Sequence, residues 1–188
     1  MIKILTIIIL GNQLFNPQLY FKQINRYDFF LCEDYGLCSY VKHHKLKLLH
    51  VLSSMRLYRD ELKSLGLKVH YNSIEDENFY EDYLKKLKKT LSKNKYKKLF
   101  FFEIEDKFFE KKLLTINKEV EIEVIKSPMF LFGRNEFNEA IKKNKKPMMA
   151  NFYKYSRMLY LYYFLPNISH KKAFFSKNAF LFSHSHNA

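Results

Sequence analysis

Short apolar runs, rich in β-branched and aromatic residues, alternate along the chain with longer segments in which apolar residues recur every three or four positions. The short runs predict buried strands, and the longer segments predict helices. We expect strands at residues 4–10, 28–33, 67–72, 97–103 and 121–125, and helices at residues 43–64, 79–91, 107–115, 135–143 and 149–165. The predicted fold class is therefore α/β, a doubly wound (Rossmann-like or flavodoxin-like) sheet of five parallel strands with helices on both faces.

The segment 43–64 gives the strongest helical signal. Its apolar residues at the helical spacing are Leu46, Leu49, Leu52 or Ser53, Leu57 and Leu62. Gly66 follows directly and is predicted to end this helix. Beyond Leu165, by contrast, the sequence has no sustained period and finishes in a string of Ser, His and Asn. A frayed terminus and a truncated or frame-shifted reading frame are the two alternatives for this tail.

The charge of the chain suggests a polyanionic partner at first sight. The 188 residues carry a formal net charge of +14, and such an excess is typical of proteins that bind nucleic acid or acidic membranes. Nearly all of the cations are lysine, however, and the chain is also rich in Phe, Tyr, Ile and Asn. This bias is what AT-rich codons produce, and a lack of arginine disfavours bidentate phosphate recognition. We therefore interpret the positive charge primarily as a result of genomic drift toward AT-rich codons rather than as a binding surface.

Several classes of protein are disfavoured by the sequence. The apolar stretch 4–10 is far shorter than the roughly 20 residues of a membrane helix, so we expect no membrane partner. No cleavage site of a signal peptide follows it. Cys32 and Cys38 are not spaced as a metal-binding pair, and we expect them to be reduced thiols in a cytoplasmic protein.

Polar residues follow the first two predicted strands, where ligands bind in open parallel sheets. These residues are Gly11, Asn12 and Gln13 after the first strand and Glu33 after the second. Glycine permits close approach of a ligand, and the two amides can donate to and accept from the edge of a flavin-like or pyrimidine-like ring. The same residues also suit an ordinary turn, so that alternative stays open.

Motifs for nucleotide binding, nucleophilic catalysis and metal binding limit the reactions that the chain is expected to carry out. The chain contains no dinucleotide fingerprint, no P-loop and no nucleophile elbow. His43 and His44 are not spaced as metal ligands on a helix, and we expect them at a helix start, facing a pocket at the edge of the sheet. Carboxylates at Glu103, Glu105, Asp106 and Glu110 form an acidic cluster after the fourth strand. A magnesium site and a solvated helix N-terminus are the alternatives there, and we favour the second. We predict no metal site and no catalytic residue.

Long ordered motifs resemble one protein family. They are ILGNQL at residues 9–14, CE at 32–33, SYVKHHKLKLLHVLSSMRLYRDELKSLGLKVHY at 39–71, SPMFLFGRNEF at 127–137 and MANFYKYSR at 149–157. Together they resemble the N-terminal domain of the iron-sulfur bacterial cryptochromes and photolyases, the photolyase-related proteins. The resemblance covers roughly residues 2–158. It implies an α/β antenna domain at 1–158 and a degenerate or truncated tail at 159–188.

In this family the antenna domain holds a ribityl-lumazine and passes excitation energy to FAD in a larger helical domain, which also carries a 4Fe-4S cluster. Position by position, the resemblance implies cofactor-binding roles for Gly11, Asn12, Gln13, Glu33, Tyr40 and Val51. His43 and His44 are expected at the same pocket. The family usually has an acidic residue where this chain has Asn12, and a Glu where it has Leu37-Cys38.

The resemblance also implies what such a chain does. Intact relatives are light-driven carbon-carbon lyases that repair DNA, or signalling proteins, with DNA as a partner. The family pattern stops after Met158, so we expect FAD and the cluster only in full-length relatives and this chain to be inactive alone. A separately encoded FAD domain is a possible partner.

Two alternatives from other classes stay open. The first is a basic nucleic-acid-binding module that uses the net charge and the aromatics at 151–153 and 160–164 to stack bases. The second is a small flavodoxin-like protein that binds FMN or a nucleotide, against which the missing phosphate-binding loop argues.

Overall fold

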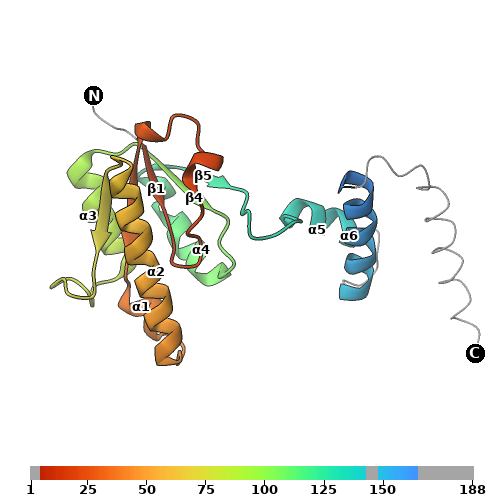
Figure 1. Cartoon of the computed structure of the whole chain (residues 1–188), viewed down its shortest axis with the longest axis horizontal. Coiled ribbons are helices and arrows are strands. Elements are labelled where there is room, and N and C mark those ends of the chain that lie inside the picture. Colours follow the sequence, from red (N-terminus) through yellow and green to blue (C-terminus); the bar gives the residue numbers. More distant parts are fainter. Residues whose placement is uncertain (1–4, 143–147, 165–188) are drawn as a thin grey trace, which may run out of the picture. The chain divides into compact units, whose positions relative to one another are not determined.

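Five parallel strands form one sheet in the order β3-β2-β1-β4-β5 (Figure 1). The structure is a computed structural model that describes residues 5–142 and 148–164. The strands are β1 (Leu5–Ile8), β2 (Tyr27–Cys32), β3 (Val69–Asn72), β4 (Lys98–Phe102) and β5 (Glu121–Ile125). All four strand pairs are parallel. The predicted parallel five-stranded sheet is therefore confirmed, and its order is that of the Rossmann fold rather than the flavodoxin fold.

Helices follow the strands as the periodicity predicts. They are α1 (Tyr35–Ser39), α2 (Lys45–Ser64), α3 (Tyr83–Asn94), α4 (Lys107–Leu114), α5 (Arg134–Lys142) and α6 (Met149–Phe164), with 3-10 turns at Pro17–Leu19, Ile24–Arg26 and Thr115–Lys118. Only the five-residue α1 among these α-helices has no counterpart in the prediction. Helix α2 ends where expected, because Gly66 takes a positive φ of 74° and its N–H bonds to the carbonyl of Lys63.

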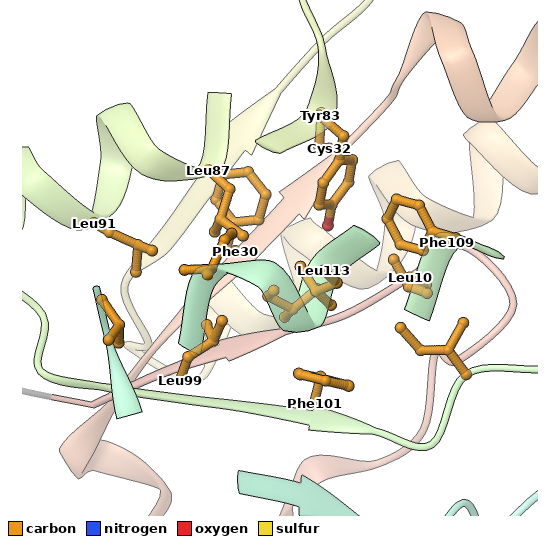
Figure 2. Close-up of a cluster of buried hydrophobic side chains, with 14 of the residues drawn as sticks. Leu10, Phe30, Cys32, Tyr83, Leu87, Leu91, Leu99, Phe101, Phe109 and Leu113 are labelled. Atoms are coloured by element: carbon orange, nitrogen blue, oxygen red, sulfur yellow. The ribbon is translucent and has the colours of Figure 1, made fainter. Parts of the chain in front are cut away.

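Alternate residues of the strands face two separate cores, as the pleat of a β-strand requires. On one face, Ile8, Phe30 and Phe101 pack against α3 and α4. Figure 2 shows Phe30 and Phe101 in this cluster. On the other face, strand residues such as Ile7 pack against Tyr58 of α2 and against the segment that joins β1 to β2. Helices therefore cover both faces of the sheet, which makes the fold doubly wound.

The buried face of α2 is only in part the one that the leucine spacing outlines, because Leu62 is buried as predicted but three of the other leucines are not. Leu46, Leu49 and Leu57 are exposed, whereas Met55 and Tyr58 are buried. The helix carries apolar residues on more than one face, so periodicity locates the helix but does not identify the side that packs on the sheet.

The chain divides into two compact units, Met1–Met129 and Phe130–Ala188. In the second, α5 contacts α6, with the rings of Phe137 and Phe152 4.9 Å apart between centroids. This division lies within the predicted 1–158 domain, and the predicted boundary at residue 158 stays a prediction. The predicted tail beyond residue 164 and the side chains of residues 160–164 lie outside the described part of the chain. Within that part, no helix combines the length and the hydropathy that a membrane span requires.

Candidate ligand-binding cavity

A cavity of about 620 Å³ opens at the carboxyl ends of β1, β2 and β4. Strand β1 lies between β2 and β4. The chain leaves β1 toward one face of the sheet and leaves β4 toward the other, so the fold forms a crevice between these two strand ends. The volume is in the range of cofactor sites, roughly 300–1,000 Å³. The lining residues are Leu10, Gly11, Asn12, Cys32, Glu33, Asp34, Leu37, Cys38, Tyr40, His43, Lys47, Leu48, Val51, Leu52, Met55, Ile104, Glu105, Asp106, Phe108 and Phe109.

One wall of the cavity is the apolar side of α2. Leu48, Val51, Leu52 and Met55 recur at a spacing of three and four residues, so they share one side of the helix, and all four line the cavity. Gly11 permits this wall to approach the end of β1, because a Cβ at Gly11 would lie 2.8 Å from Cγ1 of Val51 and 2.9 Å from Sδ of Met55. The glycine thus sets the distance between the sheet and the helix.

Replacing Gly11 by alanine is expected to lower the free energy of unfolding by about 1–3 kcal/mol, because the added methyl group overpacks the contact with Val51 and Met55. Urea unfolding measures this loss. The same change in a Val51→Ala background should cost less, since the atom that Cβ meets most closely is gone. Equal costs in the two backgrounds would contradict this account.

Glu33 lies at the floor of the cavity, but its carboxylate is already engaged. Both of its oxygens accept from Arg56, at 2.7 and 3.0 Å, and they also accept from the hydroxyl of Tyr71 and, at 2.9 Å, from the backbone N–H of Ile74. Burial by itself raises the pKa of Glu33, but these hydrogen bonds outweigh it and hold the pKa below its ordinary value of 4.5. Glu33 therefore joins β2, α2 and the end of β3 rather than presenting a free acceptor.

Asp34 is the second buried carboxylate of the cavity. Nζ of Lys86 lies 2.8 Å from its Oδ1, and both side chains are almost fully buried. The same ammonium group donates to the carbonyl of Phe79 at 3.1 Å. Burial raises the pKa of the neighbouring Cys32 to about 12 and also raises that of Cys38, so both thiols that line the cavity are protonated at neutral pH.

The rim of the cavity is aromatic and polar. Phe108 is 88% exposed and Tyr40 is 64% exposed, although both line the cavity. The rings of Tyr40 and His43 meet edge to face at 5.9 Å. Nδ2 of Asn12 donates to Oε2 of Glu105 at 3.1 Å and so connects the segments that follow β1 and β4.

The structure brings six of the eight predicted site residues together at this cavity, namely Gly11, Asn12, Glu33, Tyr40, His43 and Val51. The other two are placed elsewhere. Gln13 is fully buried, and its Nε2 donates to the carbonyl of Glu103 at 2.8 Å. Nδ1 of His44 accepts from the N–H of Leu46 at 3.2 Å, so this histidine caps α2.

Sequence reasoning missed the wall that follows β4, which Ile104, Glu105, Asp106, Phe108 and Phe109 form. The rule that ligands lie beyond strand ends applies to every neighbour of the switch-point strand, so β4 could have been included. The helical neighbours of Val51 could have been found by their spacing of three and four residues.

The acidic cluster after β4 is a helix start and a set of structural contacts. Asp106 caps α4, Glu105 bonds to Asn12, and Oε2 of Glu103 accepts from the N–H of Ser127 at 3.3 Å. This outcome agrees with the favoured interpretation of a helix N-terminus. Across residues 5–142 and 148–164, no group of three or more His, Cys, Asp or Glu residues is arranged to hold a metal ion.

Comparison with known proteins places the chain in a family. A 46-residue stretch, 24% of the chain, is 44% identical to the "(6-4) photolyase" of Agrobacterium fabrum strain C58. That stretch spans only 9% of the relative's length. The family model described as deoxyribodipyrimidine photo-lyase-related protein matches residues 7–160, which is most of the chain and includes the whole cavity. The chain belongs to the photolyase-related protein family.

Proposed function

We propose that the Met1–Met129 unit binds a ribityl-lumazine in the cavity at the ends of β1, β2 and β4 and serves as the antenna part of a photolyase-related protein. The observation that carries the proposal is the cavity itself, which combines an apolar wall with a polar rim. When bound, such a chromophore absorbs light and passes excitation energy to a flavin. Flavin chemistry, DNA binding and an FAD-binding domain lie outside this proposal, and we propose no catalytic residue in the Met1–Met129 unit.

The residues fit a flat, uncharged ring. Val51, Leu52 and Met55 offer an apolar wall on one side, and close approach is possible because Gly11 has no side chain. The buried charges at the floor are compensated, since Glu33 pairs with Arg56 and Asp34 with Lys86. A neutral ring can therefore enter without meeting an unpaired buried charge.

Polar groups around the ring have distinct tasks in this proposal. The hydroxyl of Tyr40 and the amide of Asn12 lie at the rim, where they can bond to the ring edge or the ribityl chain. Glu33 holds the wall in place through Arg56 rather than accepting from the ligand. Leu37 and Cys38 also line the cavity, where the resemblance leads one to expect a carboxylate.

Titration of the full chain with a ribityl-lumazine, followed by absorption and fluorescence, tests the proposal. The wild-type chain is expected to bind, and Val51→Trp is expected to weaken binding by roughly tenfold or more, equal to about 1.4 kcal/mol, because the indole occupies the space of the ring. Leu57→Trp is the matched control, since it places the same residue on α2 at a position that is 72% exposed and outside the cavity. A wild-type chain that binds no lumazine would overturn the proposal.

The nucleic-acid alternative draws less support from the structure. Several lysines of α3 and α4 already have carboxylate partners: Lys85 and Lys89 pair with Glu81, Lys88 with Glu119, and Lys112 with Asp82. These ammonium groups are engaged within the unit, so the net charge does not translate into an equal number of available phosphate contacts.

A further inference from the structure

Helix α2 carries three leucines on its outer side, where they meet water. Leu46, Leu49 and Leu57 are 60%, 61% and 72% exposed. At about 100° per residue, they lie about 120–200° around the helix from the buried Met55. They therefore form a stripe on the side of α2 that is turned away from the sheet (Figure 1), and we term it the outer leucine stripe.

The outer leucine stripe is narrow. Ser53 is also exposed and lies between the leucines, so the stripe follows a spacing of three, four and four residues. A seam of this width is typical of a helix that packs against one other helix, whereas a helix that lies in a membrane surface presents a broader apolar face. The stripe therefore fits the apolar side of a single amphipathic helix.

The charge at the start of α2 is positive and available to a partner. Residues 35–59 include no Asp or Glu. Lys42, Lys45 and Lys47 are exposed, and none of them forms an ion pair with a residue that the structure describes. Lysines of α3 and α4, by contrast, pair with carboxylates of their own unit, as Lys88 does with Glu119. The N-terminal half of α2 thus keeps its positive charge for an external carboxylate.

The C-terminal half of α2 is close to neutral. Arg59 pairs with Asp60, and Glu61 and Lys63 carry opposite charges. The charge complementary to α2 is therefore concentrated at one end, so a matching helix has its acidic residues beside Leu46 rather than spread evenly along its length.

A second copy of the chain matches this surface poorly. The chain carries a net charge of +14, and molecules of like charge repel one another. The basic end of one outer leucine stripe would meet a partner helix whose other end is merely neutral. Charge complementarity therefore favours an acidic partner over self-association.

We propose that the outer leucine stripe binds a partner protein through an amphipathic helix that has leucine-type residues on one side and acidic residues at its flanks. The leucines supply the apolar area that becomes buried, and Lys42, Lys45 and Lys47 pair with the carboxylates of the partner. The three leucines lie outside the cavity, so this inference goes beyond the proposed function and does not depend on it.

The experiment measures binding of the full chain to a labelled synthetic peptide by fluorescence anisotropy. The peptide has about three heptads, with leucine at positions a and d and glutamate at e and g, and the like charges at e and g keep it from pairing with itself. A second peptide carries lysine in place of glutamate. We expect the glutamate peptide to bind at least about tenfold more tightly, and this preference should decrease at high salt.

Leu49→Gln tests the apolar part of the stripe and is expected to weaken binding of the glutamate peptide by about tenfold, because an anchoring side chain is lost. Leu114→Gln is the matched control. Leu114 is an exposed leucine of α4, which packs on the opposite face of the sheet, so binding should be unchanged.

Lys45→Glu tests the charge. It should weaken binding of the glutamate peptide and strengthen binding of the lysine peptide, while a glutamate in the first turn is favourable for the helix itself. Lys111→Glu is the matched control, because Lys111 is an exposed lysine of α4 and its replacement changes the net charge by the same amount. Circular dichroism verifies that each variant is folded.

The proposal is overturned if the wild-type chain does not prefer the glutamate peptide, or if the α4 variants weaken binding as much as the α2 variants do. Two further measurements assign the stripe to another occupant. Sedimentation equilibrium that shows self-association, abolished by Leu49→Gln, would assign it to a second copy. Binding to phosphatidylglycerol vesicles without binding to the peptide would assign it to a membrane surface, and either result would overturn the proposal.

Discussion

Replacing Lys86 by methionine is expected to lower the free energy of unfolding by about 3–5 kcal/mol. The side chain of Lys86 is fully buried in α3, and methionine fills a similar volume but leaves the buried carboxylate of Asp34 without its 2.8 Å partner. Unfolding in urea, followed by circular dichroism, measures the loss. Because small domains are stable by only about 5–15 kcal/mol, this single change removes a large part of the total.

Lys89→Met is the matched control. Lys89 lies on the same helix and pairs with Glu81, but it is exposed, so its loss should leave the unfolding midpoint unchanged. Adding Asp34→Asn to Lys86→Met should recover part of the stability, because asparagine keeps the cap of α1 and carries no charge. Equal behaviour of Lys86→Met and Lys89→Met would show that the buried pair contributes nothing.

Replacing Glu33 by glutamine is expected to lower the free energy of unfolding by about 2–3 kcal/mol, the second largest loss that we predict. In wild type, both oxygens of the Glu33 carboxylate accept hydrogen bonds from Arg56, Tyr71 and Ile74. Either orientation of the glutamine amide turns its NH₂ group toward some of these donors, which then lose their acceptor. Arg56 is 35% exposed, so water takes up part of its charge and the cost falls below that of a fully buried pair. Glu75→Gln, on the exposed second partner of Arg56, is the matched control and should leave the midpoint unchanged.

The cost of Glu33→Gln is expected to depend on pH. The pKa of Glu33 is lowered in the folded chain, so its charge stabilises the fold above the ordinary value of 4.5 that the unfolded chain has, and this contribution is lost as the pH falls through the lower folded value. The difference between wild type and variant should therefore be full at pH 7 and shrink in acid. A difference that stays constant between about pH 7 and pH 3 would contradict this assignment.

The strands and the longer helices could be predicted because burial imposes a period on their sequence. Phe29 and Phe30 face opposite cores, so the run that contains them is apolar throughout, as in other parallel sheets. Helix α1 could not be found in this way, because five residues are too few to display a helical period. Its signal is Asp34 as a cap, which a polar turn would also explain.

The candidate site was predicted in outline only. Gly11 and Val51 both line the cavity because the strand end and the helix converge in folds of this type, and their cofactor-binding roles stay predictions. The buried role of Lys86 could not be predicted, since hydropathy assigns every lysine to the surface and Lys86 sits in a lysine-rich run. Gln13 turned inward because its amide could satisfy the carbonyl of Glu103, a partner 90 positions away.

The central position of β1 affects how the unit is assembled during synthesis. Leu5 and Ile8 leave the ribosome before the rest of the sheet, and the strand residues with which they pair on one side, Lys98 and Phe101, are made only after most of the unit. Until then β1 keeps one apolar edge without a hydrogen-bonding neighbour, and such an edge is prone to intermolecular pairing. The cavity, whose last wall follows β4, is completed at the same late step, so a bound ligand stabilises only chains in which this long-range pairing has formed.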